Sequence, residues 1–328
     1  MENEKKIVLE ARNIKKYFPV KTSFGKASAE VKAVDGVSLI LREGETYGLV
    51  GETGCGKSTL GRTILKLVEP TAGEIRINGE DITHLNERQM IPYRQKMQMV
   101  FQDPYTSLDP RRKVGDLLME ALAIQKIGTK KERMELTMEM LGKVGLRPQH
   151  FYRYPHEFSG GQRQRVGLAR ALILNPGFVV CDEPVSALDV SVQSQIINLL
   201  LDLQEGGKVT YLFIAHDMSV VKYISTRIGV MYLGNLVEEA ATDELFSLPS
   251  HPYTQALLSS VPSSNPRVKK ERIILEGEIP SPMHVPQGCV FHTRCMYSMP
   301  ICEKQKPEMK EISGGHCVAC HLYQQKDE

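Results

Sequence analysis

Hydrophobic and polar positions follow different patterns in successive parts of the 328-residue chain. In roughly the first hundred residues, short apolar runs such as "IVLEARNI" and "EIRINGEDI" alternate with glycines, which predicts strands, some of them antiparallel. From Pro104 to about Pro155, apolar residues recur three and four positions apart in "VGDLLMEALAIQ" and "ERMELTMEMLGKVGL". This spacing is typical of amphipathic helices and predicts a helical subdomain inserted over about 104–155.

The pattern then returns to strands that alternate with helices. "FVVCDEP" and "VTYLFIAHD" are typical of buried strands, and "VSVQSQIINLLLDLQEGG" between them has the period of an amphipathic helix ended by two glycines. Such alternation predicts a mainly parallel sheet covered by helices on both faces. Prolines multiply after Pro249. We therefore predict an α/β domain over 1–247 and a C-terminal extension over 248–328.

Composition narrows the possible functions only slightly. Hydrophobic residues make up 41% and charged residues 24% of the chain, as in ordinary globular proteins. A net charge of +2, without a dense basic stretch, gives no reason to expect nucleic-acid binding. The N-terminal "MENEKKIVLE" lacks the apolar core of a secretory signal, and no apolar run is long enough to span a membrane. We expect the chain to stay in the cytosol.

A glycine-rich segment, "GETGCGKST", follows one predicted strand and precedes a predicted helix. These residues, 51–59, are called the P-loop. Backbone N–H groups of such a loop, together with the helix dipole, bind phosphate. Lys57 is expected to reach the outer phosphates and Ser58 to bind Mg²⁺. A chance glycine-rich turn is the alternative, but the strand–loop–helix context argues against it. The residues predicted to bind ATP and Mg²⁺ here are Gly51, Glu52, Thr53, Gly54, Cys55, Gly56, Lys57, Ser58 and Thr59.

One further residue of this loop and two acidic residues later in the chain have more than one interpretation. Cys55 lies at the start of the predicted helix, where a lowered pKa would make its thiol reactive, but we interpret it as a loop residue without a catalytic role. At the end of "FVVCDEP", Asp182 suits a Mg²⁺-binding role and Glu183 suits the general base that polarises the attacking water. A solvated acidic turn is the alternative for this pair.

"FSGGQRQRVGLARAL" resembles the signature motif of the ATP-binding cassette (ABC) family, with Phe158 in place of the usual leucine. The other family motifs occur in the family's order along the chain. "VFQDP" with Gln102 precedes the signature, and "SALD" and then "FIAHD" with His216 come after it. The resemblance implies a P-loop NTPase fold with a RecA-like core plus antiparallel β and helical subdomains. It also implies head-to-tail dimers in which four signature residues act on the partner's ATP: Ser159, Gly160, Gly161 and Gln162.

The same resemblance implies roles for single residues. Gln102 would sense the γ-phosphate, Mg²⁺ and the attacking water, and His216 would contact the γ-phosphate. The family stacks adenine on an aromatic residue near the N-terminus. Tyr17 and Phe18 are both available in "NIKKYFP", and the spacing from "RNI" favours Phe18.

The C-terminal part resembles a narrower group. "HPYTQALLSSVP", "LEGEIPSPMHVPQGCVFHTRC" and "VACHL" resemble the C-terminal extension of the ATPase subunits of oligopeptide and dipeptide ABC importers, a family that includes nickel and glutathione uptake systems. The resemblance implies a peripheral subunit on the cytoplasmic face of the membrane. Its implied partners are a second, non-identical ATPase, two transmembrane permeases docked near Gln102 and the helical insertion, and an extracytoplasmic binding protein. The transported solute is not encoded in this chain.

Five of the seven cysteines lie in the extension. By the resemblance, four of them hold a [4Fe-4S] cluster, and Cys317 is the departure from the family pattern. Four thiolates also suit zinc, but zinc ligands usually come in closely spaced pairs, which only Cys317 and Cys320 form. This spacing favours the cluster over zinc, and a metal-free reduced tail is the third possibility. The predicted metal ligands are Cys289, Cys295, Cys302 and Cys320.

Two other classes of ABC ATPase fit part of the sequence. Some DNA-repair proteins combine cassettes with cysteine-rich zinc modules, but long insertions separate their P-loop from the signature. Here Lys57 and Ser159 are only 102 positions apart (159 − 57). ATPases of iron–sulfur assembly lack an extension containing "GEIPSP". A peptide importer is therefore the leading hypothesis.

Overall fold

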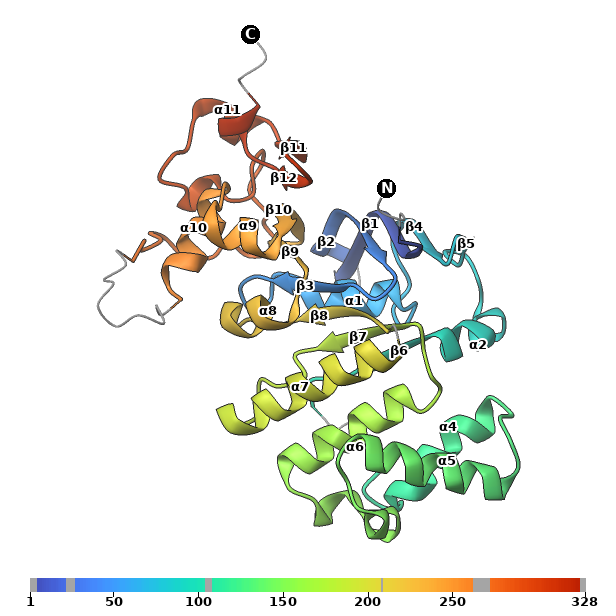
Figure 1. Ribbon diagram of the computed structural model, residues 1–328. Coiled ribbons are helices and arrows are strands. Elements are labelled where there is room, and N and C mark those ends of the chain that lie inside the picture. Colours follow the sequence, from blue (N-terminus) through green and yellow to red (C-terminus); the bar gives the residue numbers. More distant parts are fainter. Residues whose placement is uncertain (1–4, 22–26, 104–107, 208, 262–271, 325–328) are drawn as a thin grey trace. The chain divides into compact units, whose positions relative to one another are not determined.

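The computed structural model describes residues 5–21, 27–103, 108–207, 209–261 and 272–324. The chain folds into two compact units, between which it passes several times (Figure 1). The signature unit comprises Met1–Leu9, Ile40–Glu45 and Arg76–Ile214, and the P-loop unit comprises Glu10–Leu39, Thr46–Ile75 and Ala215–Glu328. The two units are distinguished by which parts of the chain pack together, and neither unit begins or ends near residue 248. The domain boundary predicted there stays a prediction.

The signature unit is built on parallel strands. β7 (Phe178–Asp182) lies between β6 (Met97–Val100) and β8 (Thr210–Ile214), and both pairings are parallel. Every residue of β7 and β8 is buried, as the continuous apolar runs predict.

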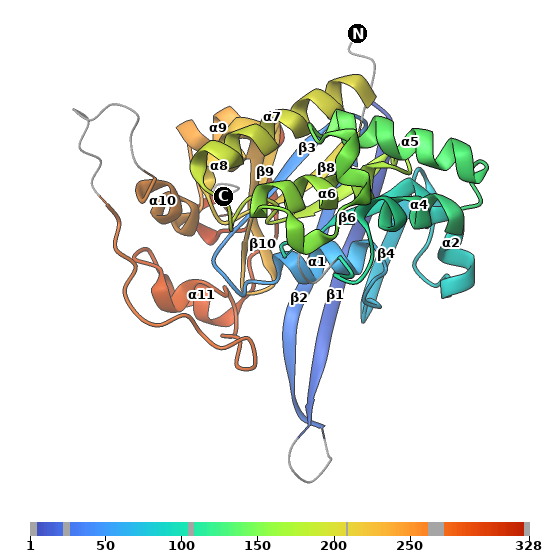
Figure 2. The ribbon, with the colours of Figure 1, turned by 90° about the horizontal axis from the view of Figure 1, so that it is seen from below.

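Helices make up most of the rest of this unit. In the predicted insertion, α4 contacts α5, and both contact α6 (Figure 2). The insertion therefore packs directly on the helix that carries the signature motif. The helices are α2 (Glu87–Lys96), α4 (Val114–Ile124), α5 (Lys130–Lys143), α6 (Gly160–Leu172) and α7 (Val190–Gly207), with 3₁₀ turns at Pro148–Tyr152 and Pro155–Glu157.

The P-loop unit has a mixed sheet that includes the C-terminal extension. β3 pairs in parallel with β9, β9 pairs antiparallel with β10, and β10 pairs antiparallel with β12, where Glu238 faces Val318. The extension therefore continues the sheet that contains the strand leading into the P-loop (Figure 1). The strands are β3 (Thr46–Val50), β9 (Arg227–Tyr232), β10 (Asn235–Ala241), β11 (Lys310–Ser313) and β12 (His316–Val318).

A second sheet has the order β2–β1–β4–β5, and its β4–β5 pair is antiparallel, as expected for part of the first hundred residues. No helix within the described residues is long and apolar enough to cross a membrane. The strands of this sheet are β1 (Ile7–Lys21), β2 (Ala27–Arg42), β4 (Ala72–Ile77) and β5 (Glu80–Asp81). The helices of the P-loop unit are α1 (Lys57–Ile64), α8 (Met218–Ile224), α9 (Thr242–Ser247), α10 (Pro252–Ser259) and α11 (Pro300–Lys304), with 3₁₀ turns at His292–Arg294 and His321–Tyr323.

Candidate ATPase site

The P-loop joins β3 to α1 and depends on glycine for its path. Gly54 and Gly56 have φ angles of 82° and 105°, a region that favours glycine. A Cβ on Gly56 would lie 2.0 Å from the carbonyl oxygen of Ala33, so no other residue fits. The first helical hydrogen bond of α1 runs from the Leu60 N–H to the Gly56 carbonyl. The preceding N–H groups therefore project from the helix end, where its dipole favours an anion.

Lys57 lies inside this loop and is only 4% exposed. Its ammonium Nζ donates to the carbonyl oxygens of Gly51 at 2.8 Å and Glu52 at 3.0 Å. The Lys57 ammonium is thus held against the backbone of a loop that opens a helix, and a cation at this position suits a polyphosphate.

The surroundings of Cys55 bear on the two sequence-based interpretations of its thiol, as a reactive group or as a loop residue without a catalytic role. Its side chain is buried, with Sγ 3.6 Å from Lys57 Nζ. Burial raises the pKa of the Cys55 thiol, and the nearby ammonium of Lys57 only partly offsets this effect. This raised pKa argues against a reactive thiolate and favours the interpretation of Cys55 as a loop residue without a catalytic role.

His216 belongs to the same unit as the P-loop. The N–H of Ala215, the residue before it, donates to the carbonyl of Leu49 in β3 at 3.2 Å. Asp217, the residue after it, caps α8 by accepting the Ser219 N–H at 2.8 Å. The exposed His216 is thus fixed between a bond to the P-loop strand and the start of a helix.

The two aromatic candidates for adenine stacking have different surroundings. The Tyr17 hydroxyl donates to the carboxylate of Asp35, and burial followed by this bond raises its pKa. The Phe18 ring is 38% exposed and has the Lys16 ammonium 4.8 Å from its centroid. Phe18 therefore presents more of its ring than Tyr17, in line with the sequence-based preference.

The signature unit contains the predicted catalytic carboxylates. Asp182 ends β7 and is fully buried, and Glu183 follows with a φ of 46°. This left-handed conformation is uncommon for a residue with a side chain and costs energy. The Glu183 N–H donates to the Ile214 carbonyl at 3.0 Å, and the Gln102 amide Nε2 donates to Glu183 Oε2 at 2.9 Å. The structure thus brings the predicted sensor and the predicted base into direct contact.

The signature motif forms the N-terminus of α6. Ser159 caps the helix by accepting the Gln162 N–H, and the Gln162 side chain accepts the Ser159 N–H at 3.1 Å. A Cβ on Gly161 would lie 2.6 Å from a methyl group of Val192 in α7, so the small residue allows the two helices to approach. Ser159 and Gly160 are exposed. The motif thus presents the N-terminus of a helix to solvent, a surface suited to an anion.

Sequence reasoning missed one residue that fixes the segment after Glu183. The Gln193 side-chain amide donates to the carbonyls of Val185 at 3.1 Å and Leu188 at 2.9 Å. The Ser186 hydroxyl donates to the Glu183 carbonyl at 3.2 Å. Gln193 stands in an amphipathic helix with no feature that distinguishes it from other polar positions, so the sequence contained no signal for this role.

The four cysteines predicted to bind metal interact with one another. Burial, followed by the neighbouring thiols of Cys289, Cys295 and Cys302, raises the pKa of Cys320 to about 12. Burial also raises the pKa of Cys289 to about 11, with Cys302 and Cys295 among the causes. The pKa of Cys317 responds to burial, Glu239, Glu311 and Arg227, and to no other cysteine.

These thiols therefore form one group from which Cys317 is separate. Among the described residues, however, no group of three or more His, Cys, Asp or Glu side chains is arranged to hold a metal ion. The described residues thus show neither a [4Fe-4S] cluster nor a zinc site, and the four predicted ligands stay a prediction.

Comparisons with known proteins agree with the sequence motifs. Residues 34–186 match the family model "ABC transporter", and residues 237–302 match "Oligopeptide/dipeptide transporter, C-terminal region". The chain is 55% identical over 320 residues to the oligopeptide transport ATP-binding protein AppF of Bacillus subtilis, covering 96% of this chain and 97% of the relative. The chain belongs to the ABC family of oligopeptide and dipeptide transport ATP-binding proteins.

Other members of this family are also close in sequence. The dipeptide transport ATP-binding protein DppF of Escherichia coli is 48% identical, covering 98% of this chain and 96% of the relative. Among solved structures, the ATP-binding cassette MJ0796, in a dimeric post-hydrolysis state bound to ADP and Pi, matches with a TM-score of 0.65 and 29% identity. The match covers 71% of this chain and 98% of the MJ0796 chain. The predicted P-loop ABC ATPase fold is confirmed.

Proposed function

We propose that this chain is the ATP-hydrolysing subunit that energises import of peptides across the cytoplasmic membrane. The observation that carries the proposal is one chain that combines a P-loop around Lys57, a Gln102–Glu183 contact and a C-terminal region typical of oligopeptide and dipeptide transporters. Nickel and glutathione import are less favoured because the similar proteins AppF and DppF are named for peptide transport.

In the proposed hydrolysis, Lys57 binds the outer phosphates and Ser58 and Asp182 hold Mg²⁺ near them. Mg²⁺, when bound, neutralises charge that develops on the phosphate oxygens. Glu183 accepts a proton from water, whose oxygen attacks the γ-phosphorus while the bond from that phosphorus to the β–γ bridging oxygen breaks. Gln102 orients Glu183, and His216 contacts the γ-phosphate. ADP and phosphate are released.

The signature motif is proposed to act on the ATP of a second, non-identical ATPase subunit. The supporting observation is the exposed N-terminus of α6 at Ser159 and Gly160, a surface suited to an anion. Binding of ATP would close the two subunits, and hydrolysis would separate them.

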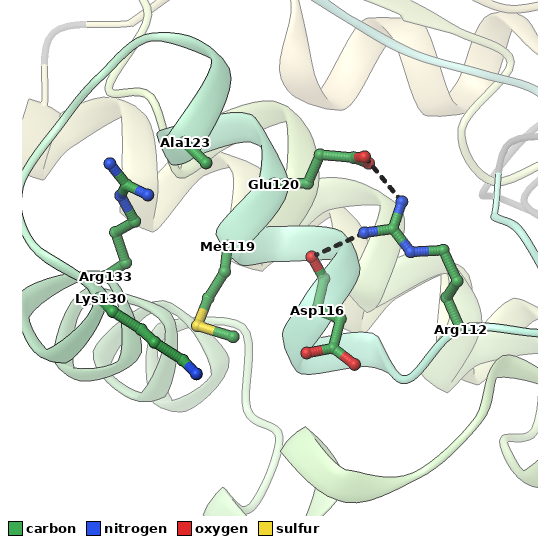
Figure 3. A pocket seen from close by; sticks show the side chains of 7 residues that line it. All are labelled: Arg112, Asp116, Met119, Glu120, Ala123, Lys130 and Arg133. Atoms are coloured by element: carbon green, nitrogen blue, oxygen red, sulfur yellow. Dashed lines mark hydrogen bonds and ion pairs between the residues drawn. The ribbon is translucent and has the colours of Figure 1, made fainter.

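The helical insertion is the proposed docking surface for the permease. A hollow on its surface lies over α4 and α5, where the Arg112 guanidinium is bonded to the Glu120 carboxylate at 2.7 Å (Figure 3). Ile124, at the end of α4, is 65% exposed. An apolar side chain beside charged groups suits a protein partner better than water. The residues that line the hollow are Arg112, Asp116, Met119, Glu120, Ala123, Lys130 and Arg133.

The cysteine extension is proposed to hold a metal centre, either a [4Fe-4S] cluster or zinc. The mutual interaction of the Cys289, Cys295, Cys302 and Cys320 thiols supports this set of ligands and the exclusion of Cys317. A bound centre would supply structural cross-linking of a proline-rich segment that has little core of its own.

Transport in vesicles tests the proposed function. The chain is reconstituted with the proposed permeases and partner ATPase, and uptake of labelled di- to pentapeptides is measured with ATP and the binding protein present. We expect peptide uptake that disappears with Lys57→Ala. Uptake of nickel or glutathione in place of peptides would overturn the assignment, as would ATP hydrolysis that DNA stimulates and permeases do not.

A further inference from the structure

Glu52, the second residue of the P-loop, is bonded to residues far along the chain. Arg294 Nη1 lies 3.2 Å and 3.1 Å from its two carboxylate oxygens. The backbone N–H of Glu52 donates to the hydroxyl of Tyr253 at 2.9 Å. Both the side chain and the backbone of this loop residue are therefore held by the C-terminal part of the P-loop unit, 201 and 242 positions later in the sequence.

The residues that hold Glu52 are themselves rigidly packed. The rings of Tyr232, Tyr253 and Phe291 contact one another, with centroid separations of 4.8 to 5.4 Å. Each ring is at most 1% exposed. Arg294 Nη1 also donates to the Tyr232 hydroxyl at 3.5 Å, and its guanidinium carbon is 6.0 Å from the Tyr232 ring centroid. Each ring comes from a different segment, so the cluster joins β9, α10 and the cysteine-rich segment.

A second set of bonds fixes the start of α10, the helix that carries Tyr253. The buried carboxylate of Glu238 accepts the N–H groups of Ser250 at 2.6 Å and His251 at 3.0 Å. The same carboxylate lies 2.7 Å from Nε2 of His316 in β12. Contacts therefore continue without interruption from the last strand of the extension to the P-loop backbone.

The Arg294 guanidinium also compensates the negative charge of Glu52 in the P-loop. The two side chains are 8% and 23% exposed, so solvent screens them only in part. Without Arg294, an unpaired carboxylate would stand in the loop that receives a polyphosphate, and like charges repel. Removing Arg294 should thus weaken nucleotide binding by freeing the loop and by exposing it to an uncompensated negative charge.

We propose that Arg294 and Tyr253 are positioning residues for the nucleotide, which hold Glu52 so that the C-terminal extension sets the affinity of the P-loop for ATP. This inference rests on the proposed ATPase function and deepens it. It assigns the extension an effect on the first step of the reaction cycle in addition to the structural role of a metal centre.

The test measures binding of ADP and of the β,γ-imido analogue of ATP to the full chain by calorimetry. We expect Arg294→Met to weaken binding on the order of tenfold, as for loss of a hydrogen bond to a charged group. Glu52→Gln in the Arg294→Met background should recover part of the loss, because it removes the unpaired charge. A general folding defect would not be rescued in this way. Ser313→Ala is the control, because the Ser313 hydroxyl also links the extension to a carboxylate, that of Glu244 in α9 at 2.9 Å.

Tyr253→Phe is the milder variant and removes a single hydroxyl from a buried ring. We expect about three- to tenfold weaker binding and faster hydrogen exchange at the Glu52 amide. Wild-type affinity in both Arg294→Met and Tyr253→Phe, or no recovery in the double variant, would overturn the inference. Failure of the wild-type chain itself to bind nucleotide would instead overturn the proposed function.

Discussion

The side-chain amide of Gln102 donates a hydrogen bond of 2.9 Å to the carboxylate of Glu183. The bond joins the residue expected to sense the γ-phosphate to the residue expected to accept the proton from water. Glu183 also has an energetically costly φ of 46°, which sets the direction in which its side chain leaves the backbone but not the position of its carboxylate. Movement of Gln102 would therefore change the orientation of the base, which gives a physical route from a docked permease to the rate of hydrolysis.

Replacing this base should separate binding from turnover. Glu183→Gln keeps the size of the side chain and loses the carboxylate, so we expect nucleotide affinity near wild type and ATP turnover lower by about 10²- to 10⁴-fold. Steady-state phosphate release and calorimetric binding are the two measurements. Glu139→Gln, which changes an exposed carboxylate paired with Lys143 on α5, is the control and should leave both unchanged. Undiminished turnover in Glu183→Gln would remove this residue as the base.

A methyl group at Gly161 should displace the signature helix. Its position would be 2.6 Å from the Val192 side chain, so Gly161→Ala should destabilise the protein by about 1–3 kcal/mol and reduce ATPase activity. Gly167→Ala is the matched control in the same helix, because a Cβ there meets no atom within 4 Å. It should stabilise the helix by about 0.5–1 kcal/mol. Denaturant unfolding followed by an ATPase assay checks both variants, and equal effects of the two would contradict the packing argument.

His316 should make the stability of the extension depend on pH. Its ring nitrogens lie 2.7 Å from Glu238 and 3.2 Å from Glu244, and the bond to Glu238 is the main cause that raises the pKa of His316. A raised folded-state pKa contributes stability that is complete below the unfolded value and is lost as pH rises through the folded value.

The unfolding midpoint of wild type should therefore exceed that of His316→Gln by more at pH 6 than at pH 9. His284→Gln, which replaces an exposed histidine of the same extension, serves as the control for loss of an imidazole ring. A difference between wild type and His316→Gln that is constant across this range would contradict the role of the charged imidazole.

Metal analysis tests the composition of the cysteine group. Cys289→Ser should lower iron and acid-labile sulfide, or zinc, in protein purified without air, because Cys289 interacts with the other three thiols. Cys317→Ser should leave the metal content unchanged, since Cys317 has no cysteine among its interactions. About four irons and four sulfides per chain would identify the cluster, whereas one zinc and no sulfide would identify a zinc site. Wild-type metal content in Cys289→Ser would exclude this ligand set.

Local signals made the conformation of the two proposed phosphate-binding segments predictable from the sequence. The loop at Lys57 and the helix start at Ser159 are formed by consecutive residues whose glycines and caps dictate the local backbone. The strands β7 and β8 follow from continuous apolar runs for the same local reason. These parts of the fold and of the site needed no knowledge of distant contacts.

The remaining features depend on distant contacts and had no local signal. Arg294 meets Glu52 only because the sheet and α10 bring two remote segments together, and charge alone does not indicate which of many glutamates an arginine will pair with. The burial that raises the pKa of Cys55 likewise comes from the folded surroundings and opposes the lowering expected at a helix start. Tertiary packing decides both cases.

The pairing of β12 with β10 has a consequence for synthesis of the protein on the ribosome. β10 ends at Ala241, but its antiparallel neighbour begins at His316, close to the end of the described chain. During translation the outer side of β10 thus stays without that neighbour until the chain has emerged as far as Val318. An unpaired strand edge is prone to pair with strands of other chains. A truncated product would therefore expose to aggregation the edge of β10 that β12 covers in the folded protein.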